Sequence, residues 1–592
     1  MAALSQYNYI FFITAILAFL DAWNIGANDV ANSFASSISS RCLTMKQAVL
    51  VASITELAGS ISVGSRVADT IRTRVIDPSL YAETPSVLLL AMMCTVFGSA
   101  VFLTIATRYG LPVSTTHSTI GGLVGAATAS VGISKINWGV SGVSQVFLAW
   151  IIAPGIAGFL GAILFLFTKM AVLARKQAVR NALFSIPVYT FITVGALTML
   201  VAWKGVQVVE EPSTELMIIL VFTIAGGAAI IVALFLLPYL WRRIMSEDWP
   251  LKWYMIWQGP FLLKRPQPPP TPPGFNKLKI KNYYQGHLTP EELFYVRASD
   301  TLLKSVQTSP DGSCPIFLDN DDDFVLPPPA QAVPSMHGAI VAPSSSSTRC
   351  QTPNNDLIPP RPPGHWTTPK VFLWKINRIL LHGLEQDVVR LQKINSVLTW
   401  DIATMHSKAQ RFDNRAEHAY SFLQVITAAA ASFVHGANDV SNSAAPLSTA
   451  YEVWLHNEVP MKVGVPIWIL CLGGGAIVLG LLTYGYHVMR NLGNRLTLIS
   501  PSRGFCMELS TAITVLMATR LALPVSTTQC ITGATVGVGL ANGDWRSINP
   551  RLVAFIYFGW IITLPVTAFL SGSMMAIILN APTWATGVVT PT

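Results

Sequence analysis

The chain has 592 residues, of which 52% are hydrophobic and only 12% are charged. Soluble globular proteins carry about 25% charged residues, so this composition excludes a soluble domain and indicates a protein of the lipid bilayer. The formal net charge of +9 fits the Lys and Arg excess of cytoplasmic flanks, and we expect no nucleic-acid partner. The apolar runs do not alternate with polar residues, which favours membrane-spanning helices over a β-barrel.

Residues 1–240 are predicted to form a first membrane block. Basic residues follow the first, fifth and seventh of its apolar stretches, and such flanks favour the cytoplasm. The fourth stretch is short and glycine-rich, as expected of a broken or re-entrant span. The seven stretches are 8–40, 47–64, 86–107, 109–130, 138–168, 185–203 and 215–240.

Residues 241–418 are hydrophilic and are predicted to form a cytoplasmic loop that is largely disordered. An acidic run lies at 319–323. The aromatic stretch 249–263 is expected at the membrane interface, and 370–397 has the apolar spacing of an amphipathic helix. Proline runs occur at 266–273, 327–329 and 359–363.

Residues 419–592 are predicted to form a second membrane block with five more apolar stretches. The total of 12 spans makes the chain an all-α polytopic membrane protein, with both termini outside the cell and the 241–418 loop inside. The five stretches are 419–450, 465–488, 503–520, 521–541 and 551–580.

Two short motifs occur once in each membrane block. Gly-Ala-Asn-Asp-Val-Ala-Asn at 26–32 recurs with one Ala-to-Ser change at 436–442, 410 positions later. Leu-Pro-Val-Ser-Thr-Thr at 111–116 recurs unchanged at 523–528, 412 positions later. Two motifs at matched spacing indicate an internal duplication.

The duplication divides the membrane part into two repeats, with the first in 1–168, the second in 419–592 and two extra spans between them. The first copy starts at span one and the second at span eight. Because this displacement is odd, the repeats are predicted to have inverted topology. Inverted repeats are a recurrent transporter architecture, in which the sites lie near the midplane between the repeats.

The first motif places acids inside apolar spans, where a carboxylate is costly and by default marks a function. It pairs Asn28 with Asp29 in one repeat and Asn438 with Asp439 in the other. Their oxygen atoms are hard ligands, which suit a small hard cation rather than a soft metal. The structural alternative is that these residues hold helices together by hydrogen bonds.

The second motif places three hydroxyls at a helix start behind a proline. Free amide protons and a partial positive charge at such a start can bind a tetrahedral oxyanion. The alternative is ordinary Ser and Thr back-bonding beside a proline kink. Arg108 and Arg520, four residues before each motif proline, either reach the anion or cap helix C-termini. The candidate anion ligands are Ser114, Thr115, Thr116, Ser526, Thr527 and Thr528, with the amides of Asn32 and Asn442.

The two motifs together predict coupled transport. An anion beside Asp29 and Asp439 is repelled unless a cation binds with it, so the affinities for anion and cation are linked. Glu56 and Glu508 are acids inside other apolar spans and are further candidates for cation coupling. The alternative for these two glutamates is pairing within the helix bundle.

With these motifs the chain resembles the inorganic phosphate transporter (PiT) family, and it is most similar to the fungal plasma-membrane sodium/phosphate symporters. The similarity covers residues 5–240 and about 400–580. It implies 12 spans, extracellular termini, a large cytoplasmic loop and cotransport of inorganic phosphate with sodium or protons. The functional positions of the family fall here on Asp29, Glu56, Asp439 and Glu508, and on the hydroxyls at 114–116 and 526–528.

We therefore predict a secondary active symporter of the plasma membrane that imports inorganic phosphate with Na⁺ by alternating access. Na⁺ is assigned to Asn28, Asp29, Asn438 and Asp439. The expected partners are phosphate, sodium ions and the lipid bilayer, with a homodimer left open, and neither a cofactor nor an enzymatic activity is expected. Two alternatives remain: a proton-coupled phosphate or sulfate carrier, and a phosphate sensor or scaffold that signals through the 241–418 loop.

Overall fold

The computed structural model contains no β-strand within the residues that it describes, apart from an isolated bridge between Thr497 and Ile548. The prediction of an all-α protein is therefore confirmed. The described residues are 4–75, 77–139, 142–204, 213–270, 280–306, 358–394, 397–399, 401–459, 464–520 and 525–580.

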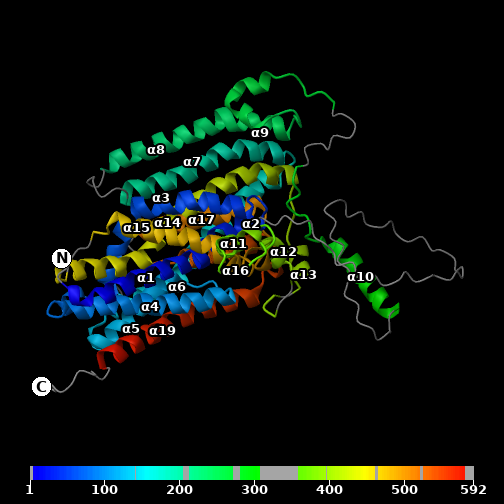
Figure 1. Cartoon of the computed structure of the whole chain (residues 1–592). Helices are drawn as coiled ribbons and strands as arrows, with labels where there is room; N and C mark the ends of the chain where they lie inside the picture. The colour runs from blue at the N-terminus through cyan, green and yellow to red at the C-terminus, as the bar shows by residue number, and fades with distance from the viewer. Residues whose placement is uncertain are drawn as a thin grey trace, which may run out of the picture.

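The first membrane block consists mainly of long helices that lie side by side (Figure 1). Its first two helices are joined by η2, a wider π-helical turn that carries the first motif. Turns of this kind are frequent at functional sites. The elements are α1 (Asn8–Ile25), η2 (Gly26–Val30), α2 (Ala31–Ser39), α3 (Met45–Val75), α4 (Pro85–Tyr109), α5 (Thr115–Ser130), α6 (Val143–Thr168), η5 (Lys169–Leu173), α7 (Ala178–Lys204), α8 (Thr214–Ile231), η6 (Val232–Leu236) and α9 (Leu237–Ile244).

The second membrane block begins with α14, the longest helix of the described chain. The first motif here lies within a continuous α-helix, without the π-helical turn of its counterpart. The elements are α14 (Asn414–His456), α15 (Ile467–Tyr484), α16 (Tyr486–Met489), η8 (Gly493–Arg495), α17 (Pro501–Arg520), α18 (Thr527–Ala541), η9 (Trp545–Ser547) and α19 (Pro550–Asn580).

Parts of the loop between the blocks are folded. The expected amphipathic segment forms two helices, α11 and α12. α11 packs on α15, and Asp387 caps the N-terminus of α12. The proline run at 327–329 and the acidic run at 319–323 lie outside the described residues. The loop elements are η7 (Trp253–Lys264), α10 (Pro290–Val306), α11 (Pro369–Glu385), α12 (Val388–Gln392) and α13 (Ile402–Ser407).

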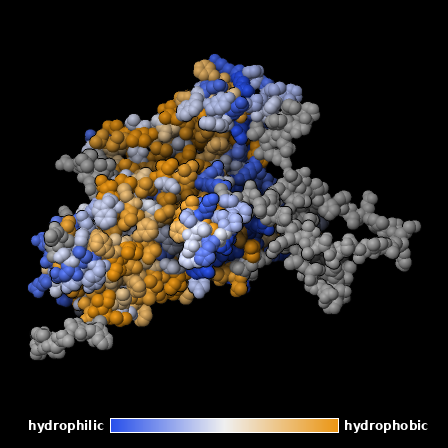
Figure 2. Space-filling model, in the orientation of Figure 1, coloured by the Kyte–Doolittle hydropathy of each residue, from blue (hydrophilic) through white to orange (hydrophobic). Residues whose placement is uncertain are grey.

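Eight helical segments among the described residues are long and apolar enough to cross a bilayer. Figure 2 shows the hydrophobic surface that these helices present, with hydrophilic residues gathered toward the two ends of the bundle. The short helices α5 and α18 have 16 and 15 residues, or about 24 Å, which is less than a hydrocarbon core of about 30 Å. Shortness is what the sequence predicts for broken spans, and the total of 12 spans stays a prediction.

Helices of the two blocks pack against each other in matching pairs. The short α5 packs along α19, and the short α18 packs along α6. α1 and α14 run in opposite directions. This direction follows from a hydrogen bond that the indole of Trp454, near the end of α14, donates to Asn8 at the start of α1 (2.9 Å). The start of α1 and the end of α19 lie at one end of the bundle, and α11 to α13 lie toward the other (Figure 1).

Glycines allow the closest of these contacts. A Cβ on Gly26 of η2 would lie 1.8 Å from the carbonyl oxygen of Ile477 on α15. In the matching place, a Cβ on Gly436 of α14 would lie 2.3 Å from the carbonyl oxygen of Glu56 on α3. The backbones of α1 and α15, and of α14 and α3, therefore touch at equivalent positions of the two repeats.

We expect Gly480→Ala to destabilise the protein, because the added Cβ would lie 1.8 Å from the carbonyl oxygen of Trp23 on α1. Overpacking of this kind costs about 1–3 kcal/mol, so the melting temperature of the purified protein in detergent should fall. The matched control is Gly475→Ala on the same helix, where no atom lies within 4 Å of the new Cβ. Equal melting temperatures for the two variants would contradict this contact.

Candidate functional site

The two hydroxyl motifs lie at the starts of the short helices α5 and α18. Gly110, at φ 66°, ends α4, and the chain stays non-helical until Thr115 begins α5. Ser114 caps α5 by accepting a hydrogen bond from the amide of His117 (3.3 Å). The hydroxyl of Ser526 at the start of α18 is buried and has no hydrogen-bond partner among the described residues. Leu523 and Pro524 of the second motif lie outside the described residues.

Asp29 is buried and contacts both hydroxyl motifs. Its Oδ2 accepts a hydrogen bond from Thr115 of the same repeat (2.7 Å), and its Oδ1 accepts one from Thr528 of the other repeat (2.8 Å). This carboxylate therefore joins the two membrane blocks at the helix starts that the sequence predicts to bind an anion.

Asp439 has a related set of contacts. Its Oδ2 accepts a hydrogen bond from Thr527 (2.7 Å), and its Oδ1 accepts one from the amide of Asn438 (2.9 Å). The corresponding acid and hydroxyl of each repeat, Asp29 with Thr115 and Asp439 with Thr527, are thus paired in the same way.

The motif asparagines reach across to the opposite repeat. The amide of Asn32 donates to the hydroxyl of Thr528 (2.8 Å). The amide of Asn442 donates to the hydroxyls of Thr115 (3.1 Å) and Thr116 (3.3 Å). The structure therefore brings the acids, amides and threonines of both motifs into one hydrogen-bonded centre.

Asn28 is engaged elsewhere. Its Nδ2 donates to the hydroxyl of Thr107 (3.1 Å) and the carbonyl of Leu111 (3.0 Å), and its Oδ1 accepts from the amide of Val113 (3.0 Å). This amide holds the non-helical stretch before α5 in place. Asn438 is half-buried, and its contact to Val525 is long, at 3.5 Å. The assignment of both residues to Na⁺ stays a prediction.

A histidine that sequence reasoning missed joins Glu56 to this centre. His435 Nδ1 lies 2.8 Å from Glu56 Oε2, and its Nε2 lies 2.9 Å from Asp439 Oδ2. Ser432 donates a second hydrogen bond to Glu56 (2.7 Å). The signal in the sequence is the spacing of His435, four residues before Asp439, which puts both on one helix face. Ligand atoms of Asp29, His435 and Asp439 lie within 4.8 Å of one another.

Glu508 occupies a separate polar cage. Its Oε1 accepts hydrogen bonds from Ser36 (2.6 Å), Ser37 (2.7 Å) and Gln424 (3.2 Å), and its Oε2 accepts one from Thr427 (2.6 Å). Four donors from α2 and α14 thus surround one buried carboxylate on α17. Glu56 and Glu508 therefore differ, because only Glu56 is joined through a histidine to the central aspartates.

Arg108 lies away from the centre. It is in the last turn of α4, and its guanidinium donates to the hydroxyl of Tyr484 at the surface (3.4 Å). This position agrees with the interpretation that it sits at a helix C-terminus. The side chain of Arg520 lies outside the described residues.

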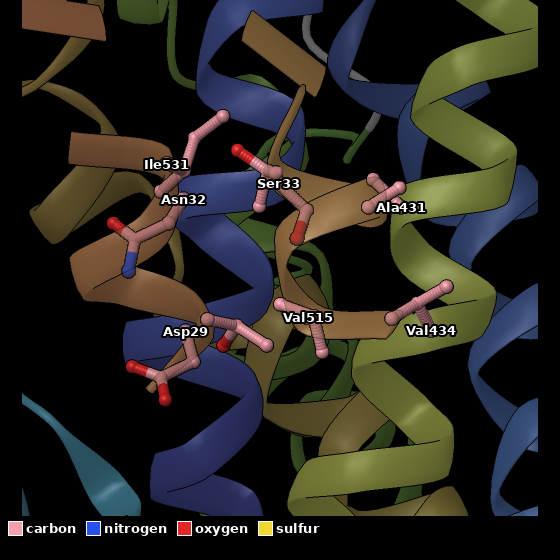
Figure 3. A pocket seen from close by; sticks show the side chains of 10 residues that line it. Asp29, Asn32, Ser33, Ala431, Val434, Val515 and Ile531 are labelled. Carbon is pink, nitrogen blue, oxygen red and sulfur yellow. The ribbon is translucent and has the colours of Figure 1, made fainter. Parts of the chain in front are cut away.

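A small pocket, with room for about one water molecule, lies beside the centre. Asp29 and Asn32 line one part of it, and apolar side chains from the second repeat line another (Figure 3). The pocket therefore connects the shared carboxylate with a cavity between α2, α14, α17 and α18. Its lining residues are Asp29, Asn32, Ser33, Ala431, Val434, Thr511, Ala512, Val515, Thr527 and Ile531.

Comparison with known proteins gives a consistent result. Residues 25–571 match the model of the PHO4 phosphate transporter family. The chain is 46% identical over 591 residues to the phosphate-repressible phosphate permease pho-4 of Neurospora crassa, with 98% of this chain and 99% of that protein covered. It is 26% identical to the sodium-dependent phosphate transporter 1 of Mus musculus, with 95% and 94% covered.

A solved structure described as the sodium-dependent phosphate transporter shares the fold. The match has a TM-score of 0.56 at 24% sequence identity and covers 97% of this chain and all of that one. The family and the relatives are transporters and permeases, which confirms the predictions of phosphate transporter resemblance and of a chain that is not an enzyme.

We expect Glu508→Gln to lower the melting temperature of the purified protein. The new amide is neutral, so the four donors lose their charged acceptor, and a hydrogen bond to a charged group contributes about 1.5–3 kcal/mol. Glu452→Gln is the matched control, because Glu452 is half-buried and pairs with His456 near the end of α14. If Glu508→Gln melted like its control, the four-donor cage would be wrong.

Proposed function

Because the chain belongs to the phosphate transporter family, we propose that it is a symporter that imports inorganic phosphate with Na⁺ across the plasma membrane. The observation that carries this proposal is the position of Asp29, which accepts hydrogen bonds from the hydroxyl motifs of both repeats. A single carboxylate at the junction of two anion-binding helix starts links the cation to the anion. The sodium-dependent relative in mouse supports the choice of Na⁺.

Phosphate would bind between the starts of α5 and α18. Both starts present backbone amides and partial positive charge toward the centre. The free hydroxyl of Ser526 and the amides of Asn32 and Asn442 add donors that suit a phosphate oxygen. Thr115, Thr116, Thr527 and Thr528 complete the set.

The hydroxyl protons provide a physical basis for coupling. A threonine hydroxyl has one proton to donate and two lone pairs with which to accept. Thr115, Thr527 and Thr528 now donate their protons to Asp29 and Asp439. If Na⁺ bound these carboxylates, the hydroxyl oxygens could face the cation and turn their protons toward phosphate. Cation binding would thus create anion donors, and the two affinities would rise together.

The transport cycle would be alternating access between two inverted repeats. Three features support inverted topology: the odd displacement of the motifs, the opposite directions of α1 and α14, and the matching pairs α5–α19 and α6–α18. We place both termini outside and the 241–418 loop inside the cell. In this orientation the pocket beside Asp29 lies on the cytoplasmic side, because α14 begins there and Ala431 precedes Asp439.

The decisive experiment is uptake of radiolabelled phosphate by proteoliposomes that contain the full chain. An inward Na⁺ gradient at equal pH on both sides should drive accumulation above equilibrium, and an inward proton gradient without Na⁺ should not. Asp29→Asn and Asp439→Asn should each remove most of the Na⁺ stimulation, because an amide holds a cation far less strongly than a carboxylate.

The control for these variants is Asp544→Asn, a half-buried acid that caps η9 away from the centre. Uptake that does not respond to the Na⁺ gradient but is driven by the proton gradient would contradict this proposal and indicate proton coupling. Accumulation under neither gradient would contradict symport altogether.

Ser526→Ala should raise the Michaelis constant for phosphate about tenfold, because a hydrogen bond to a charged group contributes about 1.5–3 kcal/mol. Its melting temperature without phosphate should stay unchanged, since the hydroxyl has no partner. Ser114→Ala is the comparison variant: its loss of a helix cap, about 1 kcal/mol, should lower the melting temperature. An unchanged Michaelis constant in Ser526→Ala would remove this hydroxyl from the anion site.

A further inference from the structure

A fifth acid lies inside the membrane block, outside the centre described above. Asp21 on α1 is fully buried, and among the described residues only the hydroxyl of Ser99 lies close to its carboxylate, without the geometry of a regular hydrogen bond. The buried acids Asp29, Glu56, Asp439 and Glu508 all accept hydrogen bonds. An unpaired carboxylate in a bilayer core is costly, so Asp21 is relieved either by a proton or by a bound cation.

Two neutral side chains place oxygen atoms near Asp21. The hydroxyl of Ser99 on α4 faces it and is hydrogen-bonded to the hydroxyl of Ser118 on α5 (2.9 Å). Asn24 lies one turn further along α1, and its Oδ1 is also buried without a partner. No basic side chain among the described residues forms an ion pair with Asp21. Carboxylate, hydroxyl and amide oxygens are the ligands that hard cations prefer.

Asp21 is connected to the centre by a line of polar side chains between α1 and α4. Asn24 donates to the hydroxyl of Thr104 (2.9 Å), and Asn28 donates to that of Thr107 (3.1 Å). Asp29 follows directly. Eight residues of helix separate the two aspartates, which is about 12 Å along the axis.

The internal duplication assigns Asp21 a place in the transport path. The offset of 410 between the first motifs and the offset of 412 between the second motifs map the surroundings of Asp21 onto the pocket beside Asp29. The corresponding place in the first repeat carries an acid and an amide where the pocket has two apolar side chains. The matched pairs are Asp21 with Ala431, Asn24 with Val434 and Ser99 with Thr511.

The two places lie on opposite sides of the central aspartates, because each precedes its motif on helices that run in opposite directions. In the proposed orientation the pocket faces the cytoplasm, and Asp21 lies in the outer half of the path.

We propose that Asp21, with Asn24 and Ser99, forms a second cation site that takes Na⁺ from the extracellular side before it reaches Asp29. The extracellular placement rests on the proposed orientation and function, whereas the site itself rests on the buried oxygen atoms. The second repeat has no acid at this position, so the site belongs to one half of the cycle only.

The direct test measures Na⁺ binding without transport. The full chain carrying Asp29→Asn and Asp439→Asn is purified in detergent, and its melting temperature is followed as NaCl replaces choline chloride at constant ionic strength. Na⁺ should still raise the melting temperature, because a ligand of the folded state stabilises it. Adding Asp21→Asn should remove most of this rise, and the exposed acid change Glu83→Gln should not. Without Na⁺, Asp21→Asn should melt at or above its parent, because it removes a buried charge.

A transport measurement separates this inference from the proposed function. In proteoliposomes, Asp21→Asn alone should raise the half-saturating Na⁺ concentration about tenfold while the maximal rate is kept. Ser99→Ala keeps the charge of Asp21 and should raise the half-saturating Na⁺ concentration by less. It provides a second variant if Asp21→Asn is poorly folded.

Two results would overturn the site. One is a Na⁺-dependent rise in melting temperature that Asp21→Asn leaves unchanged, and the other is the absence of this rise in the protein that carries only Asp29→Asn and Asp439→Asn. If Na⁺ drives uptake in the wild type but Asp21→Asn changes neither measurement, only the second site fails. If Asp21 is needed for Na⁺ stabilisation but no gradient drives uptake, the site stands and the symport proposal fails.

Discussion

The structure depends on one constraint: three of its buried carboxylates, those of Asp29, Glu56 and Glu508, are satisfied by groups from the other half of the chain. Asp29 is bound by Thr115 of its own repeat and by Thr528 of the other, and Glu56 is bound by Ser432 and His435 across the interface. Because an unpaired charge in lipid costs several kcal/mol, neither half can fully satisfy these three acids alone. The hydrogen bonds that satisfy these acids also hold the two repeats together.

The symmetry of the centre is incomplete, and the differences lie where transport needs a direction. Ser114 caps its helix, whereas Ser526 leaves its hydroxyl free. His435 precedes Asp439, but Ile25 stands at the matching place before Asp29. A perfectly symmetric centre would bind equally from both faces. These substitutions make the two halves of the centre chemically unequal.

Much of the fold and the site could be predicted from sequence, because the duplication shows which residues must meet. Two identical motifs at matched spacing predict that the acids and hydroxyls converge, and they do. The role of His435 could not be predicted, since a histidine four residues before an acid is ordinary on a helix until α3 brings Glu56 beside it. The donors around Glu508 likewise come from α2 and α14, and no local pattern connects them.

The paired glycine contacts show which parts can move as units. Gly26 and Gly480 bind α15 tightly to α1, and Gly59 and Gly436 bind α3 to α14, so each rigid pair contains one helix from each repeat. The short α5 and α18 likewise lean on helices of the opposite repeat. A single repeat would leave these surfaces bare.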